Sequence, residues 1–339
     1  MLFGAAPAAV ASRPECGAVS GGRVLVTGGA GFIGSHVADL LLDRGYEVEV
    51  MDDLSSGRLE NVSEGVRFHR LDVGSAAAAQ LVREGRFDAV CHLAAQIDVR
   101  KSVADPAADA RQNIAGSLNL LEAVRASGRP CRFVFSSTGG AIYGDFAAIP
   151  TPETAPKDPQ SPYGVAKLSV ELYLAYYARV HGLDTVALRY SNVYGPRQRA
   201  DGEAGVVAIF CGRVLEDRPL TVYGDGRQTR DYIFVEDVAR ANLAALQADL
   251  PPAERLDSRS FNVGTGVETS VLQLAELVGV VAARPIDIQY APPRPGEQLR
   301  SALDVSKARQ LLGWQPEVEL EEGLRRTLRY FSELDRSVR

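Results

Sequence analysis

Four glycines near the N-terminus constrain the fold more than any other feature of the sequence. The segment reads Gly28-Gly29-Ala30-Gly31-Phe32-Ile33-Gly34, after a short apolar run at 24–26 and before a stretch with helical spacing at 32–44. Glycines at these positions allow a tight turn, let the backbone approach a pyrophosphate and let the helix pack closely on the strand. The N-terminus of that helix also offers N–H groups to phosphates. The turn therefore predicts a dinucleotide site.

Strands and helices alternate along the first half of the chain. After the strand at 24–26, further strands are expected at 46–51, 66–68, 89–93, 132–135 and 185–188, with helical stretches between most of them. This order predicts parallel βαβ units and a Rossmann-type, doubly wound α/β sheet. The run 261–263 is expected to return to that sheet.

Glycine and proline become frequent after residue 190, which predicts a smaller lobe in the second half of the chain. We expect a dinucleotide-binding domain at 23–190, with returning segments near 232–265. Residues 191–339 are expected to form mainly a substrate-binding lobe. The Ala-rich leader, 1–22, lacks the charged start of a signal peptide and is expected to be disordered.

Composition excludes several classes of partner. The 339 residues carry a net charge of -6, which argues against a nucleic-acid partner. No apolar run approaches the ~18 residues of a membrane span, so no membrane association is expected. The four cysteines form no C-x-x-C pair, which favours a reducing, cytoplasmic location. The four histidines are too dispersed for a metal site, and His92 is expected to be a hydrogen-bonded structural group.

Asp52 indicates which dinucleotide binds. It lies at the expected end of the second strand, 24 residues after Gly28, where an acidic side chain accepts hydrogen bonds from the adenosine ribose. A carboxylate there repels a 2′-phosphate, so NAD is favoured over NADP. The neighbouring Asp53 is the better candidate for an ordinary turn aspartate.

A second constellation carries acid–base chemistry. In Ser161-Pro162-Tyr163-Gly164-Val165-Ala166-Lys167, Ser161 can cap a helix whose first turn holds Pro162. Tyr163 and Lys167 then share one helical face, where the ammonium favours the phenolate. The alternative is an exposed aromatic beside a solvated lysine.

Hydroxyl side chains precede this helix, in Phe135-Ser136-Ser137-Thr138-Gly139-Gly140. A hydroxyl at the carboxyl end of a strand can hold a reacting oxygen beside Tyr163. Loop hydroxyls otherwise cap the backbone, so one of the three is expected to be catalytic and the others structural. Thr138 is the candidate, and Ser137 stays open as the alternative.

Taken together, these residues resemble the extended short-chain dehydrogenase/reductase family, and within it the UDP-glucose (UDP-galactose) 4-epimerases, over about 23–314. The resemblance rests on segments in the family's order and spacing: VTGGAGFIGSH, HLAA at His92–Ala95, NIAGSLNLLEA from Asn113, SSTGGAIYG, SPYGVAK, LRYSNVYGPRQ, GDGRQTRDYIFVEDVA and PRPGEQ.

The resemblance implies tightly bound NAD, a UDP-sugar substrate and a homodimer. It implies a cofactor site lined by Gly28, Gly31, Phe32, Ile33, Gly34, Asp52, Asp72, Val73, Leu93, Ala94, Asn113 and Lys167. It implies catalysis by Tyr163, Lys167 and Thr138, the first and last also touching the sugar. It implies a UDP site at Asn192, Arg230, Arg294 and Glu297, with uridine contacts of a backbone or apolar kind near 205–207.

The same resemblance separates reaction types. Related dehydratases follow the catalytic threonine with Asp-Glu, whereas this chain has Gly139-Gly140, which favours epimerisation through transient oxidation at carbon 4. A net oxidoreductase or dehydratase remains a rival, and a non-catalytic sugar-nucleotide or NAD sensor is a third. UDP-glucose/UDP-galactose is the expected substrate pair.

Two positions bear on the choice of sugar. Ser301 aligns where a tyrosine in relatives excludes an N-acetyl group, which leaves UDP-N-acetylglucosamine open. Arg199 follows the YGPRQ segment and could bind the carboxylate of UDP-glucuronate, since guanidinium and carboxylate form charge-assisted hydrogen bonds. Its alternative is a solvent-exposed pair with Asp201 or Glu203.

Overall fold

The computed structural model describes residues 21–145, 148–199, 205–293 and 298–338. The predicted leader, 1–22, lies outside the described residues except for its last two. Within the described ranges, no helix is both long and apolar enough to cross a membrane.

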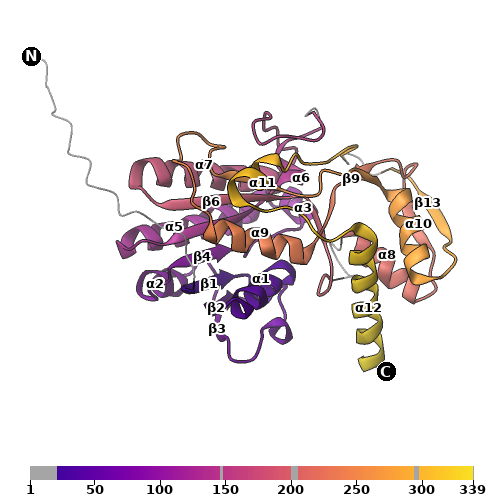
Figure 1. Cartoon of the computed structure of the whole chain (residues 1–339), viewed down its shortest axis with the longest axis horizontal. Helices are drawn as coiled ribbons and strands as arrows, with labels where there is room; N and C mark the ends of the chain where they lie inside the picture. The colour runs from indigo at the N-terminus through magenta and orange to yellow at the C-terminus, as the bar shows by residue number, and fades with distance from the viewer. Residues whose placement is uncertain (1–20, 146–147, 200–204, 294–297, 339) are drawn as a thin grey trace, which may run out of the picture.

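A seven-stranded parallel sheet forms the centre of the molecule (Figure 1). In spatial order its strands are β11 (Ser260–Val263), β6 (Asp184–Tyr190), β5 (Arg132–Thr138), β4 (Ala89–His92), β1 (Arg23–Thr27), β2 (Glu47–Asp52) and β3 (Arg67–Arg70). The predicted Rossmann-type α/β class is confirmed, and the run 261–263 lies in β11, beside β6. The strand order reverses between β1 and β4, where such sheets bind ligands outside their carboxyl ends.

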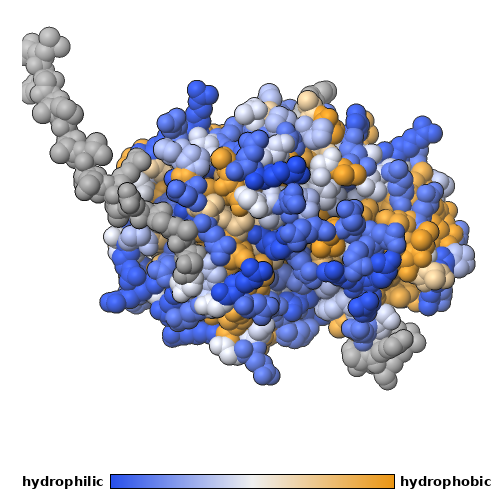
Figure 2. All heavy atoms as spheres, viewed as in Figure 1, coloured by the Kyte–Doolittle hydropathy of each residue, from blue (hydrophilic) through white to orange (hydrophobic). Residues whose placement is uncertain are grey.

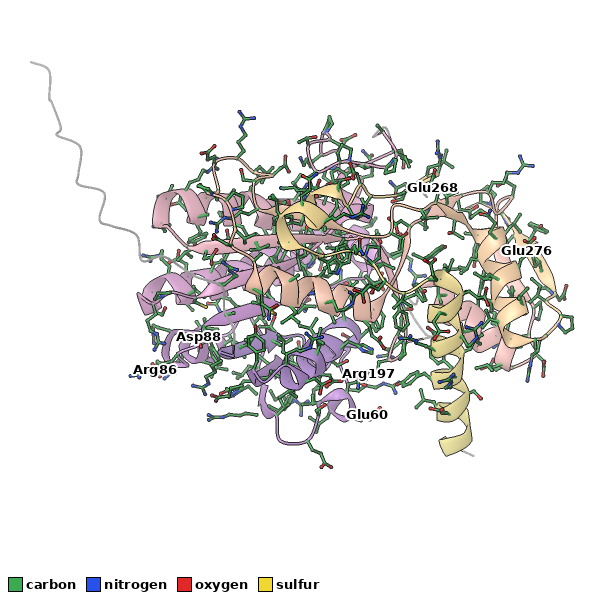
Figure 3. All side chains as sticks on the ribbon, viewed as in Figure 1. Glu60, Arg86, Asp88, Arg197, Glu268 and Glu276 are labelled. Atoms are coloured by element: carbon green, nitrogen blue, oxygen red, sulfur yellow. The ribbon has the colours of Figure 1, made fainter. Side chains whose placement is uncertain are left out.

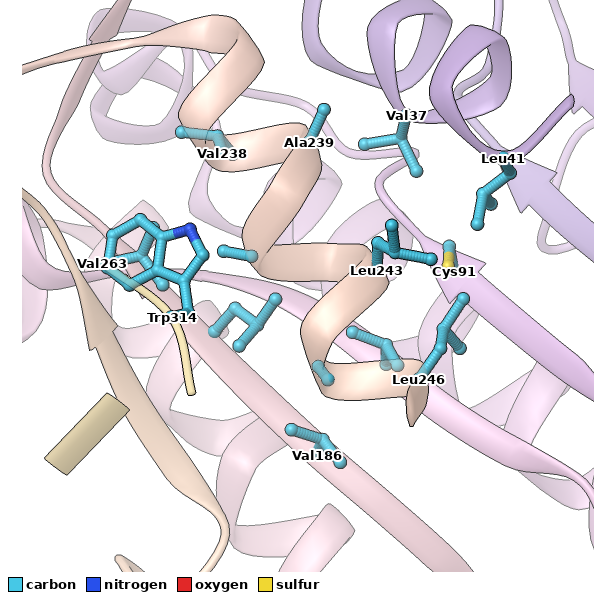
Figure 4. Packing of buried hydrophobic residues seen from close by; sticks show 14 of the residues in the cluster. Val37, Leu41, Cys91, Val186, Val238, Ala239, Leu243, Leu246, Val263 and Trp314 are labelled. Atoms are coloured by element: carbon cyan, nitrogen blue, oxygen red, sulfur yellow. The ribbon is translucent and has the colours of Figure 1, made fainter. Parts of the chain in front are cut away.

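Helices cover both faces of the sheet, because alternate side chains of each strand point to opposite faces. One face packs against α1 (Phe32–Asp43), α9 (Val235–Gln247) and α11 (Ser306–Leu312). Figure 4 shows Leu243 and Leu246 of α9 in this core, with Val37 and Leu41 of α1. The other face packs against α2 (Ala76–Glu84), α5 (Gly116–Ser127) and α7 (Pro162–His181). Burial on both faces explains why the central strands β1 and β4 are mostly apolar, whereas the edge strand β3 has no fully buried residue.

Short helices form the connections near the carboxyl edge of the sheet. They are η1 (Leu59–Asn61), α3 (Val99–Ala104), α4 (Pro106–Ala110), the π-helical turn η2 (Arg111–Ala115) and α6 (Gly139–Ile142).

The second half of the chain adds a smaller lobe with its own core. It contains α8 (Val206–Leu215), α10 (Val271–Ala282) and α12 (Leu320–Val338), packed around Phe210, Leu274 and Leu324. Three two-stranded sheets pair β7 (Asn192–Tyr194) with β10 (Tyr232–Phe234), β9 (Thr229–Arg230) with β12 (Thr269–Ser270), and β8 (Leu220–Tyr223) with β13 (Ile288–Ala291). In Figure 2 the surface is mainly hydrophilic, and hydrophobic atoms gather at the end where α10 and β13 lie.

Candidate active site

A cavity of about 400 Å³ lies at the carboxyl ends of the central strands, and both halves of the chain line it. It contains every residue predicted for the cofactor except Asn113. It also contains Thr138, Tyr163 and Asn192 from the predicted catalytic and substrate sets. The structure therefore brings most of the predicted residues to one place, at the switch point between β1 and β4.

The glycine turn forms a cradle that larger residues would fill. Gly28 has φ +70°, and a Cβ there would lie 2.7 Å from the backbone nitrogen of Ala94. A Cβ at Gly34 would lie only 2.1 Å from the carbonyl oxygen of Gly28, so α1 packs directly on the turn. No described side chain caps the N-terminus of α1, and its first turn holds no acidic residue. These N–H groups remain available to a pyrophosphate.

Asp52 ends β2 as predicted, and its carboxylate is fixed at the cavity wall. Oδ2 accepts a hydrogen bond from the backbone N–H of Ala30 (3.1 Å), and Oδ1 accepts one from Leu54 (2.8 Å). Burial raises the pKa of Asp52, while these two hydrogen bonds oppose the shift. Asp53 fixes the turn by accepting from the N–H of Ser55, as expected of a turn aspartate, yet it also lines the cavity.

Asn113 does not line the cavity. Its buried side chain accepts from the N–H of Gln96 (2.8 Å) and donates to the carbonyl oxygen of Gln96 (2.9 Å) and to Asp109 (3.0 Å). It therefore holds the loop after β4, and Ala94 of that loop lines the cavity. Among the residues of η2, Gln112 lines the cavity and Asn113 does not.

His92 has the structural role expected from the sequence. Ser117 donates its hydroxyl hydrogen to the carbonyl oxygen of Asn113, so it accepts from Nε2–H of His92 (2.9 Å). Nδ1 of His92 then accepts from the hydroxyl of Thr27 (2.7 Å), which in turn accepts from the N–H of Ala94 (3.2 Å). Burial lowers the pKa of His92 to about 3, so the ring is neutral at physiological pH.

The helix α7 presents the tyrosine and the lysine as the sequence predicts. The Ser161 hydroxyl accepts from the N–H of Gly164 (3.2 Å), and Pro162 occupies the first turn. Lys167 is buried; its Nζ donates to the carbonyl oxygen of Ser136 (2.8 Å) and lies 5.9 Å from the ring centroid of Tyr163. Burial lowers the pKa of Lys167 to about 8, and burial raises that of Tyr163.

The neighbouring hydroxyls at the end of β5 face different partners. Ser137 is buried and donates to Oε1 of Glu171 (2.5 Å), so its hydroxyl is held by α7. Thr138 is half-buried at the cavity wall. Glu171 is itself paired with the fully buried Arg189 (2.6 Å). Neither Glu171 nor Arg189 was singled out from the sequence, because the two meet only when α7 packs on β6.

The predicted substrate residues are less concentrated than the cofactor residues. Asn192 lines the cavity, as do Gly205, Val206 and Val207, the segment expected beside uridine. Arg230 is half-buried in β9 and donates to the carbonyl oxygen of Thr229 (2.8 Å), and it does not line the cavity. Arg199 is exposed and also lies outside the lining. The remaining two predicted residues, Arg294 and Glu297, lie outside the described residues.

Two contacts connect α1 with the loop that follows β7. Nε2 of His36 hydrogen-bonds the carbonyl oxygen of Pro196 (3.0 Å), and burial lowers the pKa of His36 to about 4. Arg197, beside α1 in Figure 3, forms an ion pair with Asp39 (2.7 Å). The loop after β7 is thereby attached to the helix whose N-terminus faces the cavity.

A Rossmann sheet with a glycine turn and a Tyr-x-x-x-Lys helix at one cavity is the arrangement of short-chain dehydrogenases/reductases. Residues 25–327 match the family model described as GDP-mannose 4,6-dehydratase, and the chain belongs to this family of extended short-chain dehydrogenases/reductases. A curated relative from Mycolicibacterium smegmatis, named UDP-glucose 4-epimerase, is 44% identical over 314 residues, or 91% of this chain and 98% of the relative.

Solved structures give the same result. The crystal structure of a UDP-glucose 4-epimerase with UDP-glucose from Thermotoga maritima is 47% identical, with a TM-score of 0.86 over 92% of this chain and 99% of that chain. The structure of a Thermus thermophilus UDP-glucose 4-epimerase complex with NAD is 46% identical, with a TM-score of 0.83 over 91% of this chain and 99% of that chain.

Proposed function

We propose that this protein is an NAD-dependent nucleotide-sugar 4-epimerase, an isomerase that interconverts UDP-glucose and UDP-galactose. The observation that carries the proposal is the Tyr163–Lys167 pair in the cofactor cavity, with glycines at 139 and 140 after Thr138. The relatives named UDP-glucose 4-epimerase, at 44% and 47% identity, support the choice of sugar.

The cavity fits NAD. The cradle around Gly28 and Gly34 admits a pyrophosphate beside the uncapped N-terminus of α1, and Asp52 suits a ribose diol. Bound NAD supplies the acceptor and donor for the hydride of sugar carbon 4. Retention of the cofactor throughout the cycle is essential, because its loss would strand the oxidised sugar.

Tyr163 is the acid and base, and Thr138 holds the reacting oxygen. The Tyr163 phenolate takes the proton of the 4-hydroxyl and returns it after the sugar has turned over. The Lys167 ammonium stabilises that phenolate and is fixed by its hydrogen bond to Ser136. Thr138 fits the role better than Ser137, whose hydroxyl donates to Glu171.

The substrate's nucleotide is assigned to the second half of the chain. Asn192 and the apolar segment 205–207 would contact the uridine side, and Arg230, Arg294 and Glu297 the diphosphate and ribose, since arginine forks suit phosphates. On this assignment 23–190 is the NAD domain and 191–339 is mainly the substrate lobe.

Dehydration is disfavoured at Gly139, despite the description of the family model. A Cβ at Gly139 would lie 2.4 Å from Cδ1 of Leu303, so an acidic side chain there would displace Leu303. Gly139 and Gly140 supply neither the acid nor the base that water loss requires. The Tyr163–Lys167 pair also argues against a mere sensor, which needs no acid–base machinery.

The direct test is a product assay on protein purified without added cofactor. With UDP-glucose we expect UDP-galactose, no net NADH and no need for added NAD, and denaturation should release NAD rather than NADP. Epimerisation conserves mass, whereas dehydration gives a product lighter by one water. Net NADH, a lighter product or no turnover would contradict the proposed function.

UDP-N-acetylglucosamine is a second candidate substrate. Ser301 is buried two residues before Leu303, which packs against Gly139 beside Thr138, so a small side chain lies near the catalytic turn. We expect activity on this sugar, and Ser301→Tyr should remove it while sparing UDP-glucose. Equal loss on both sugars would reject the assignment.

A homodimer is proposed from the outward face of α7. Along this helix a row of large apolar side chains is between 43% and 61% exposed: Val165, Leu172, Tyr176 and Val180. A row of exposed apolar side chains is typical of an interaction surface. Leu172→Glu should halve the mass measured by light scattering at equal protein concentration, and an unchanged mass would exclude this face.

A cytoplasmic location is proposed from the chemistry of the thiols. Cys91 and Cys211 are buried, and burial raises the pKa of each thiol to about 12, which suits a reducing compartment. Cell fractionation with an antibody to the native protein tests it, and recovery outside the cytoplasm would reject it.

A further inference from the structure

A buried carboxylate lies behind the catalytic helix and has one oxygen unused. Asp109 of α4 is 2% exposed. Its Oδ1 accepts from Nε2 of Gln96 (2.9 Å) and Nδ2 of Asn113 (3.0 Å). Its Oδ2 is buried and has no hydrogen-bond partner among the described residues. Both donors to Asp109 are neutral amides, so they supply hydrogen bonds to the carboxylate but no opposite charge.

Asp109 faces the stretch of α7 that carries the catalytic pair. A shallow groove is lined by Asp109 and Ala110 of α4 together with Val165 and Ala166 of α7. The α7 residues in the groove also include Pro162, so together they flank Tyr163 and precede Lys167 in sequence. Asp109 therefore packs against the first turns of α7, which carry the pair.

The other charged groups around the pair are compensated, neutral or exposed. On α7 Glu171 binds Arg189 of β6 through three contacts of 2.6 to 3.1 Å. On β4 His92 is neutral, because burial lowers its pKa to about 3. On the elements next to α4, the charged residues Arg100, Lys101, Asp105 and Arg111 are exposed, so solvent screens them. The half-buried Asp98, which caps α3, forms an ion pair with Arg100 (3.9 Å).

We propose that Asp109 is the counter-ion of the Tyr163–Lys167 pair, a positioning residue that keeps Lys167 charged and Tyr163 basic. The inference rests on the proposed function, in which these two side chains handle the proton. Burial lowers the pKa of Lys167 to about 8, and the charges of Asp109 and Glu171 oppose that shift. Burial raises the pKa of Tyr163, and Asp109 raises it further. Loss of the Asp109 charge should therefore lower both pKa values.

Asp109→Asn isolates the charge. The amide oxygen can keep both hydrogen bonds of Oδ1, and its NH₂ group takes the place of Oδ2, where no donor opposes it. We expect both limbs of the kcat–pH profile to move to lower pH by about one unit, a usual size for loss of one nearby charge. Asp109→Ser, a smaller neutral variant, should shift the profile in the same direction, and Asp109→Glu should leave it in place.

Gln96→Leu is the matched control. It removes a hydrogen bond from the same carboxylate but keeps the charge, so its kcat can change while the limbs stay at their wild-type pH. An unshifted profile in both neutral variants, or an equal shift in Gln96→Leu, would overturn the proposal and leave Asp109 a loop anchor.

A second readout does not need epimerase activity. The absorbance of phenolate is titrated in the NAD-loaded protein, and the curve of Tyr163→Phe is subtracted to isolate Tyr163. Asp109→Asn should move this difference titration to lower pH, and an unmoved curve counts against the counter-ion. If the wild type does not epimerise UDP-glucose, the proposed function fails while this titration still decides the role of Asp109.

Discussion

The two walls of the cavity are built in different ways. The cofactor wall consists of strand ends and the turn 28–34, which follow one another in order along the sheet. The substrate wall is assembled from 190–198 and 205–207 beside a lobe whose sheets have only two strands each. On the proposed function, the first wall would recognise its ligand largely by the backbone shape of the turn, whereas the second is built mainly from two neighbouring stretches of chain. The first should therefore tolerate less change.

Tyr163→Phe has the largest expected effect, because Tyr163 serves both walls. Loss of one hydroxyl should lower kcat by about 10²–10⁴-fold, the usual contribution of a positioned acid–base group. The fold and bound NAD should be unchanged, since the phenol is not part of the glycine cradle. Turnover and released NAD are measured on the same preparation. Turnover close to wild type would remove Tyr163 from the mechanism.

Gly34→Ala tests the backbone wall. The new Cβ would meet the carbonyl oxygen of Gly28 at 2.1 Å, so α1 or the turn must shift. Overpacking of this kind costs about 1–3 kcal/mol, and we expect a comparable loss of NAD affinity. NAD retention in Gly34→Ala equal to that of the wild type would contradict the rigid cradle.

The same difference explains what could be predicted from the sequence. The turn 28–34, Asp52 and the Tyr163–Lys167 pair are local patterns, whose spacing along a strand end or a helix determines where the side chains point. The contact of Glu171 with Arg189 is long-range. It exists because α7 packs on β6, which no local spacing encodes.

Asn113 falls between these two cases, because a local motif locates it but does not determine its contacts. The family pattern identifies it as a cofactor residue, and it does lie beside the cofactor loop. Its side chain is nevertheless fully engaged with Gln96 and Asp109, so any effect on NAD would pass through the loop. A motif can thus locate a residue near a site without specifying which group it touches.

Acid should destabilise the folded protein through the buried His36 of α1, with a smaller effect. The pKa of His36 is lowered to about 4 in the folded protein, below its ordinary value of 6.5. As the pH falls below 6.5, the unfolded chain takes up the proton first, so stability present above that pH is lost towards pH 4. We expect roughly 1–2 kcal/mol less stability at pH 5 than at pH 7 from this group.

Denaturant unfolding at the two pH values measures this loss. His36→Gln keeps a donor for the carbonyl oxygen of Pro196 but cannot titrate, so its stability should fall less on acidification. An identical fall in the variant and the wild type would assign the acid sensitivity to other groups.

Arg199→Ala should have the smallest effect. It tests whether this residue contributes to the choice between UDP-glucuronate and UDP-glucose. Arg199 is exposed and lies outside the cavity lining, whereas a guanidinium that bound a sugar carboxylate would have to face carbon 6. A contact at an exposed guanidinium contributes about 0–1 kcal/mol, or at most a factor of about five. We therefore expect the ratio of kcat/KM for UDP-glucuronate to that for UDP-glucose to change by less than this factor. The ratio is measured for both proteins at low salt, where screening is weakest. A ten-fold fall in the variant would mean that the loop closes on bound substrate and brings Arg199 to the sugar, and UDP-glucuronate would then replace UDP-glucose as the preferred substrate.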